Sequence, residues 1–475
     1  MRKILLKLLL AVVVLSFTLP AAADEEVTIG KLVFRVGTNW NGAKFARVTG
    51  FVPGITAAVI PSSVRVKTST DDRAYDYAVT SVGGFKDCTT LTSFEWLDLE
   101  QWVIDGGYGC VLSFGCFEGC TNLTEVRLSG QIRVNGSNAF KNCTSLKNIT
   151  IPVLDGTSHT FENCSNLEEV TVLQEYNSGT DPTRISEYAF AGCTKLKRVN
   201  FPPSTVVGVI EKYAFDGCES LEEIQLLNKV SYIGNSAFQN CKSLKEVDLT
   251  WIISLGYEGD VFRGCTNLET VNIGSEATYV SPQSFGDCPN LKAINLAEGN
   301  STYCSVNGSL YSKDLRYCYL ALPRDMKKFI IPEGVARAEY CFRECNSLEY
   351  ISFPKTFDVL SSTPPDKVKT IICKGWWYTG SHLFKSTTRE EGTVYVYAPN
   401  LSAYRENVNW RDFKNILPLR DGNGDGVVDV VDLNIALNLV LQSTSKEDYP
   451  GMLTDSDEKV DIELINEVIN QLLTM

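Results

Sequence analysis

The chain has 475 residues, with 57 acidic against 44 basic side chains and a formal net charge of −13 at pH 7. This negative balance disfavours nucleic acids and anionic membrane surfaces as partners. Hydrophobic residues make up 44% of the sequence and aromatic residues 10%, which is enough to fill an extended core.

Residues 1–23 have the pattern of a Sec-type export signal. Arg2, Lys3 and Lys7 lead into an apolar run that ends near Leu19, and the small residues at 21–23 suit a cleavage site. Because no cysteine follows the run, we expect release of a chain that begins near Asp24, without a lipid anchor or a later transmembrane segment. An uncleaved membrane anchor is the alternative. The signal predicts a secreted or cell-surface protein.

Residues 24–84 precede the repeats and alternate apolar with polar side chains. They include a turn-prone stretch at 48–54, Val-Thr-Gly-Phe-Val-Pro-Gly. Stacked repeats leave an apolar face exposed at each end, and this face has to be covered. We therefore expect a β-rich N-terminal cap over 24–84.

Between residues 85 and 360 the chain repeats one phrase ten times: a small residue, Phe, two further residues, Cys, and then Leu-x-x-apolar-x-apolar. Consecutive cysteines from Cys120 to Cys288 are 21 to 29 residues apart. A period in this range with a closing alternating segment is typical of leucine-rich repeats. The sequence predicts an α/β repeat fold, a leucine-rich-repeat solenoid rich in β-strands with short helical turns.

Each copy supplies the same side chains to the expected core. The Phe, the Cys and the Leu should point inward, and the closing segment should form a short parallel strand. We interpret the cysteines as small buried residues in a reduced ladder, although 16 cysteines in an exported chain would ordinarily suggest disulfides. The ladder comprises Cys88, Cys120, Cys143, Cys164, Cys193, Cys218, Cys241, Cys265, Cys288 and Cys345, and Cys116 and Cys341 occupy the preceding small-residue position.

Polar residues alternate with the apolar residues of each closing segment and should point outward. Neighbouring strands would align them in columns, giving a preformed face for an extended partner. A sheet face that is only solvated is the alternative interpretation. The candidate partner-binding residues are Arg127, Glu169, Arg198, Asn200, Glu223, Gln225, Glu246, Asp248 and Asn272.

The step from Cys288 to Cys345 is 57 residues long and holds an insertion at about 297–323. Its segment 306–311 is hairpin-like and is flanked by Cys304 and Cys318. These two thiols either form a cross-strand disulfide or remain free.

Residues 361–419 should close the far end of the stack as a C-terminal cap. They contain Trp376, Trp377 and Tyr378, which either grip a sugar or protein partner or pack within the cap.

The repeats and the C-terminal closure resemble bacterial BspA-type leucine-rich-repeat surface proteins over about residues 27–419. The phrases that carry the resemblance are AFKNCTSLKNITIP, AFAGCTKLKRVNFP, AFDGCESLEEIQL, SLYSKDLRYCYLALP and VYAPNLSAYRENVNWRDFKNI. It implies a non-catalytic adhesion or binding module for an extracellular protein or glycan, on host matrix or on a microbial surface. It implies no single ligand.

An acidic twelve-residue loop follows Pro418. Ca²⁺ takes about six to eight oxygen ligands, and such loops supply them from positions 1, 3, 5, 7, 9 and 12 with Gly at position 6. Gly426 occupies position 6 here, and a solvated acidic turn is the alternative. The predicted ligands are Asp421, Asn423, Asp425, Val427, Asp429 and Asp432.

A second loop aligns Asp455, Asp457 and Asp461 with positions 3, 5 and 9, ahead of a helix over 463–473. The duplicated unit over 420–475 resembles a type I dockerin, a small all-α calcium-loop domain. The resemblance implies a cohesin partner and, as an alternative function, recruitment into a cohesin-bearing assembly. Leu453 and Leu464 replace the first and last ligands, so the second loop departs from the pattern.

Enzyme functions are disfavoured, and we assign no catalytic residue. The only histidines are His159, expected at the surface, and His382, and neither has a partner motif for nucleophilic catalysis or zinc. A carbohydrate-active enzyme is the remaining alternative, but no pair of carboxylates stands out.

Overall fold

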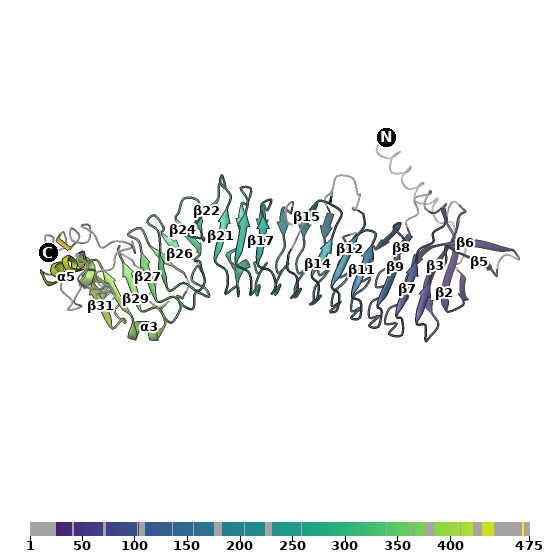
Figure 1. The fold of residues 1–475 in the computed structure, drawn as a ribbon, viewed down its shortest axis with the longest axis horizontal. Coiled ribbons are helices and arrows are strands. Elements are labelled where there is room, and N and C mark those ends of the chain that lie inside the picture. Colours follow the sequence, from purple (N-terminus) through teal and green to yellow (C-terminus); the bar gives the residue numbers. More distant parts are fainter. Residues whose placement is uncertain are drawn as a thin grey trace, which may run out of the picture. The chain divides into compact units, whose positions relative to one another are not determined.

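The computed structural model is built mainly from short strands and turns (Figure 1). The chain divides into two compact units. One unit comprises Met1–Leu244 with Asp260–Cys265, and the other comprises Lys245–Gly259 with Thr266–Met475. The structure describes residues 25–39, 42–69, 73–101, 103, 110–134, 136–154, 156–174, 183–203, 205–223, 230–257, 259–338, 340–361, 363–375, 384–408, 410–420, 430–440 and 468–469.

The first unit begins with a mixed sheet that passes into the repeats. Its antiparallel part is β1–β2–β3, and β5 pairs antiparallel with β6, whereas β3, β6, β8 and β10 are parallel. Buried apolar residues alternate along these strands, which gives the N-terminal region its own core. The strands are β1 (Glu25–Ile29), β2 (Leu32–Thr38), β3 (Lys44–Phe51), β5 (Ser63–Lys67), β6 (Ala74–Val82), β8 (Cys110–Leu112) and β10 (Ile132–Val134).

The repeats of this unit contribute two rows of parallel strands. The closing Leu-x-x-apolar-x-apolar segments form one row, and short strands between them form the other (Figure 1). The closing strands are β7 (Ser93–Trp96), β9 (Glu125–Leu128), β11 (Asn148–Ile151), β12 (Glu169–Val172) and β14 (Arg198–Asn200), with β4 (Ala57–Val59) beside β7. The other row continues with β13 (Thr183–Ile185), β15 (Val207–Ile210) and β16 (Tyr232–Ile233). The predicted solenoid is confirmed.

A column of phenylalanine rings runs through the core of the repeats. From Phe117 to Phe262, neighbouring ring centroids lie 5.1 to 5.5 Å apart and the rings are stacked. The six residues that carry the rings from Phe117 to Phe238 are at most 2% exposed. Each repeat therefore buries the ring of the repeat before it.

The turn before each cysteine uses a left-handed backbone residue. Gly, Asn and Asp adopt this conformation at low steric cost, and nine of the ten positions carry one of them. Left-handed residues interrupt helix formation, so the expected helical turns are mostly single hydrogen-bonded turns, apart from the 3-10 helix η2 (Pro282–Phe285). The positions are Asp87, Gly119, Asn142, Asn163, Gly192, Gly217, Asn240, Gly264, Asp287 and Glu344, with φ from 53° to 76°.

The ladder cysteines are hydrogen-bond donors as well as small core residues. The Cys120 thiol donates to the carbonyl of Phe85 in the preceding repeat at 3.0 Å, and the same carbonyl accepts the N–H of Cys88. Burial raises the pKa of the Cys120 thiol to about 12, so the donor proton is retained. The pattern continues at 3.0 to 3.3 Å through Cys143, Cys164, Cys193, Cys218, Cys241 and Cys265.

The second unit contains parallel strands on both sides of the insertion. Before the insertion lie β17 (Glu246–Leu249), β19 (Thr270–Ile273) and β21 (Ala293–Leu296), with β18 (Ser254–Leu255) and β20 (Tyr279–Val280). After it, one parallel sheet comprises β25 (Lys328–Ile330), β27 (Tyr350–Phe353), β29 (Thr370–Cys373), β30 (Thr393–Val396) and β31 (Asn415–Pro418). Tyr404, Trp410 and Phe413 are buried beside this sheet. The helical elements here are α3 (Ser386–Glu391), η4 (Ala398–Asn400) and α4 (Leu401–Glu406).

The insertion forms a three-stranded antiparallel unit of β22 (Tyr303–Val306), β23 (Ser309–Ser312) and β24 (Tyr317–Leu320). Cys304 and Cys318 lie on the two outer strands, and each pairs with Tyr311 of the central strand. Two strand spacings amount to about 10 Å, beyond the reach of a disulfide. The cross-strand disulfide alternative is therefore wrong, and both thiols are free.

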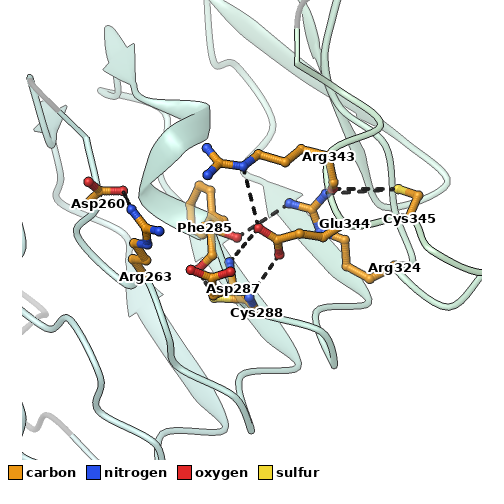
Figure 2. A network of polar contacts seen from close by, with 10 residues as sticks. Asp260, Arg263, Phe285, Asp287, Cys288, Arg324, Arg343, Glu344 and Cys345 are labelled. Atoms are coloured by element: carbon orange, nitrogen blue, oxygen red, sulfur yellow. Dashed lines mark hydrogen bonds and ion pairs between the residues drawn. The ribbon is translucent and has the colours of Figure 1, made fainter. Parts of the chain in front are cut away.

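Two charged side chains replace the contacts that a regular neighbouring repeat would make at the insertion (Figure 2). The Glu344 carboxylate accepts the N–H groups of Asp287 at 2.6 Å and Cys288 at 3.2 Å. The Arg324 side chain, only 3% exposed, donates to the carbonyls of Arg343 and Phe285. The Phe285 carbonyl corresponds to the one that accepts a thiol in the regular repeats, so a guanidinium takes the place of the cysteine.

We predict that Arg324→Met lowers the free energy of unfolding by about 2 kcal/mol or more, because two buried carbonyls lose their donor. Arg343→Met, which removes an exposed arginine of the same turn, should cost less than about 1 kcal/mol. Urea unfolding followed by circular dichroism measures both. Equal losses for the two variants would contradict this role of Arg324.

Candidate functional site

The outward side of the closing strands carries most of the predicted partner-binding residues. Arg127 lies on β9, Glu169 on β12, and Arg198 and Asn200 on β14, all in the first unit. Glu246 and Asp248 on β17 and Asn272 on β19 lie in the second unit. Glu223 is exposed outside any named strand. The outward orientation follows from the alternation, since the residues between them are mostly buried.

Cross-strand pairs hold much of this face in place. Arg198 binds Glu169 at 2.8 Å, and the Asn200 amide donates to the same carboxylate at 2.5 Å. The hydrogen bond from Arg198, and then that from Asn200, lower the pKa of Glu169. A general acid for glycoside hydrolysis needs a raised pKa instead, so Glu169 is set up as a fixed anion and not as a proton donor. In the second unit, Asn272 donates to Glu246 at 2.9 Å.

The strand row of the first unit is interrupted between β9 and β11. Among the described residues, one sheet ends with β4–β7–β9 and the next begins with β11–β12–β14, and no ladder joins them. On the inner side the same two repeats remain in contact, because Phe117 and Phe140 stack at 5.2 Å and the Phe117 N–H donates to the Ala139 carbonyl at 2.8 Å. The two repeats therefore remain neighbours, and only the pairing of their closing strands is absent.

An open groove of about 440 Å³ lies over this interruption. Residues of β9, β11 and β12 line it, together with Leu97, and they include the predicted residues Arg127 and Glu169. The volume falls within the range of sites that bind small ligands or short segments. Hereafter "the groove" means this hollow over β9, β11 and β12.

Polar groups with no assigned partner face the groove. Within the described residues, the Asn148 amide and the Thr150 hydroxyl have no hydrogen-bond partner. Asn148 and Thr150 occupy the same outward columns as Glu169 and Thr171, whose side chains accept hydrogen bonds from β14. The interruption could not be predicted from the sequence, because β9 and β11 fit the repeat pattern equally well. An amide and a hydroxyl at a groove suit hydrogen bonding to a bound molecule, not chemistry upon it.

His159 is part of a surface stack of rings. It lies 4.8 Å from Tyr188, which in turn lies 4.8 Å from Tyr213, and its Nδ1 is 2.6 Å from a Glu162 oxygen. Each of the three rings is half-buried at the same position of successive repeats. This arrangement accounts for His159 structurally.

A second surface feature, in the second unit, was missed from the sequence. Trp251, Ile253 and Tyr257 are exposed by 56%, 49% and 75%, and the Tyr257 ring lies 5.6 Å from that of Tyr279. Trp251, Ile253 and Tyr257 lie between the ladder cysteines of two consecutive repeats and share no motif, so nothing in the sequence indicated this feature.

Asp432 is the predicted calcium ligand that the structure describes. It is fully buried in the first turn of α5 (Val430–Val440). No group of three or more potential metal-binding side chains occurs within the described ranges. The other predicted residues lie outside them: Asp421, Asn423, Asp425, Val427, Asp429, Asp455, Asp457, Asp461, Gln225, Trp376, Trp377, Tyr378 and His382. The helices of the described part are all too short or too polar to cross a membrane.

The sequence matches the family described as BspA type leucine rich repeat region. Six copies cover residues 90–181, 157–292 and 316–364, which together exceed half of the chain. No curated protein sequence matches the chain significantly.

Solved bacterial structures are similar to the chain. A leucine-rich repeat protein from Bacteroides ovatus is 19% identical, with 73% of this chain and 94% of that chain covered and a TM-score of 0.46. A leucine rich cell surface protein from Faecalibacterium prausnitzii is 18% identical, with 82% and 94% covered and a TM-score of 0.33. The pneumococcal vaccine antigen PcpA is 14% identical, with 83% and 99% covered and a TM-score of 0.31.

Proposed function

The chain belongs to the BspA-type leucine-rich-repeat family, and we propose that it is a secreted or cell-surface, non-catalytic protein that binds an extracellular protein or glycan. The strand face of the first unit is the proposed binding surface. The observation that carries this proposal is the groove, where the predicted residues Arg127 and Glu169 adjoin the unpartnered side chains of Asn148 and Thr150.

A binding role suits this surface better than catalysis. The face is open and shallow, and the paired Glu169 carboxylate has a lowered pKa. A preformed polar surface loses little conformational freedom when a partner binds. The description of the Faecalibacterium prausnitzii relative as a cell surface protein supports the proposed location, as does the predicted signal at 1–23.

We predict that the full chain binds members of an array of matrix proteins and microbial glycans, and that filling the groove weakens this binding. The double change Asn148→Arg, Thr150→Arg should reduce affinity about tenfold or more, because two bulky cations replace the small polar groups. Surface plasmon resonance on the array hits measures the loss.

The matched control is Asn295→Arg on β21 in the second unit, at the repeat position that corresponds to Thr150 and outside the groove. It should leave binding unchanged. Equal affinities for the groove variant and the unchanged chain would remove the groove from the proposal.

We also propose that the C-terminal loop binds calcium, and the position of Asp432 favours this proposal. The Asp432 carboxylate is fully buried at the start of α5, where position 12 of a calcium loop would lie. Asp421, Asn423, Asp425, the Val427 carbonyl and Asp429 would complete the ligands, and the ion would balance their charge. A loop ordered in this way would be the element through which residues 420–475 engage a cohesin partner.

We predict that Ca²⁺ binds the full chain with a stoichiometry near one, as measured by isothermal titration calorimetry. Asp425→Ala should abolish binding, since it removes the ligand at position 5, whereas Asp455→Ala in the second loop should have little effect. Calcium binding that survives Asp425→Ala would exclude the first loop.

A further inference from the structure

We propose that the groove takes an extended peptide that carries a basic side chain. This inference rests on the proposed function of the strand face and names the class of partner. Three features of the groove support it: the exposed strand edges, the unbalanced charge and the aliphatic, non-aromatic character of its described lining.

The strand edges at the groove offer main-chain hydrogen bonds. Elsewhere in the unit, closing strands pair with their neighbours, but within the described residues β9 and β11 do not pair with each other. Unpaired backbone N–H and C=O groups require partners, from water or from a ligand. A peptide main chain presents the same two groups at regular intervals, which is the basis of recognition at sheet edges.

The peptide would lie along the groove and not between the strands. A strand inserted between β9 and β11 would need them about 10 Å apart. The Phe117 and Phe140 rings behind them are 5.2 Å apart, so the two repeats remain neighbours. The peptide would therefore contact only the outer edges of β9 and β11 and the side chains that line the groove.

The charge around the groove favours a cation. Arg127 lies 2.9 Å from Glu95 and only 4.0 Å from Glu125, so two carboxylates share one guanidinium. Glu169 has its own partner in Arg198. Among the lining residues that the structure describes and their ion-pair partners, one negative charge is left unmatched, and the Glu125 side chain is 64% exposed. A lysine or arginine side chain of the ligand would balance this negative charge.

The lining favours a peptide over a glycan. Sugar rings commonly pack their C–H faces on aromatic side chains, and none of the described residues that line the groove is aromatic. Leu97 and Leu128 line it instead, and Leu97 is 41% exposed. Aliphatic walls beside an amide, a hydroxyl and a carboxylate match a peptide with alternating apolar and polar side chains.

The test exposes the immobilised full chain to a synthetic random hexapeptide library and, separately, to a set of neutral oligosaccharides. The retained peptides should be enriched in Lys or Arg at one position, and the enrichment should disappear in Thr150→Arg and persist in Asn295→Arg. For the retained peptides, Glu125→Gln should weaken binding about threefold through the loss of one exposed charge. The thermal midpoint of Thr150→Arg establishes that this variant is folded.

Peptide retention without basic enrichment, or retention that is identical in folded Thr150→Arg, would overturn the inference. Groove-dependent retention of oligosaccharides in place of peptides would also overturn it, while leaving the proposed binding function in place. If neither library nor the array of matrix proteins and glycans shows binding that depends on Thr150, both the inference and the proposed use of the groove fail.

Discussion

The hydrogen bond that each ladder thiol from Cys120 to Cys265 donates to a Phe carbonyl of the preceding repeat is the contact on which the regular stack depends. It joins buried groups of adjacent repeats at 3.0 to 3.3 Å, beside phenylalanine rings that stack at 5.1 to 5.5 Å. One repeat cannot bury its own apolar side, so its order comes from its neighbours. Where the insertion displaces the next repeat, Arg324 supplies the missing donor to the Phe285 carbonyl.

The contacts of the core thiols and rings also determine how the outward strand face can vary. The rings and thiols hold neighbouring repeats close together, so the closing strands lie side by side and their polar residues form columns. At β9 and β11 the inner contact is kept while the outer pairing is lost. The result is a groove on the strand face of the first unit, supported by a packed core, which is an arrangement suited to binding.

The repeat pattern predicted the solenoid, the burial of the ladder cysteines and the outward columns that contain Arg127 and Glu169. It could not predict the groove, because Glu125–Leu128 and Asn148–Ile151 satisfy the pattern equally and their separation depends on three-dimensional packing. The disulfide alternative failed because Cys304 and Cys318 are two strands apart, a separation that the hairpin-like sequence did not reveal. The thiol donors were missed because cysteine was interpreted only as an apolar residue.

Amide hydrogen exchange of the full chain tests most directly whether the strand face opens between β9 and β11. We expect the amides of 148–151 to exchange faster than those of 169–172, because β12 is paired on both sides and β11 on one. Equal protection of the two segments would show a continuous ladder. That result would contradict the interrupted face from which the groove and its proposed partner are derived.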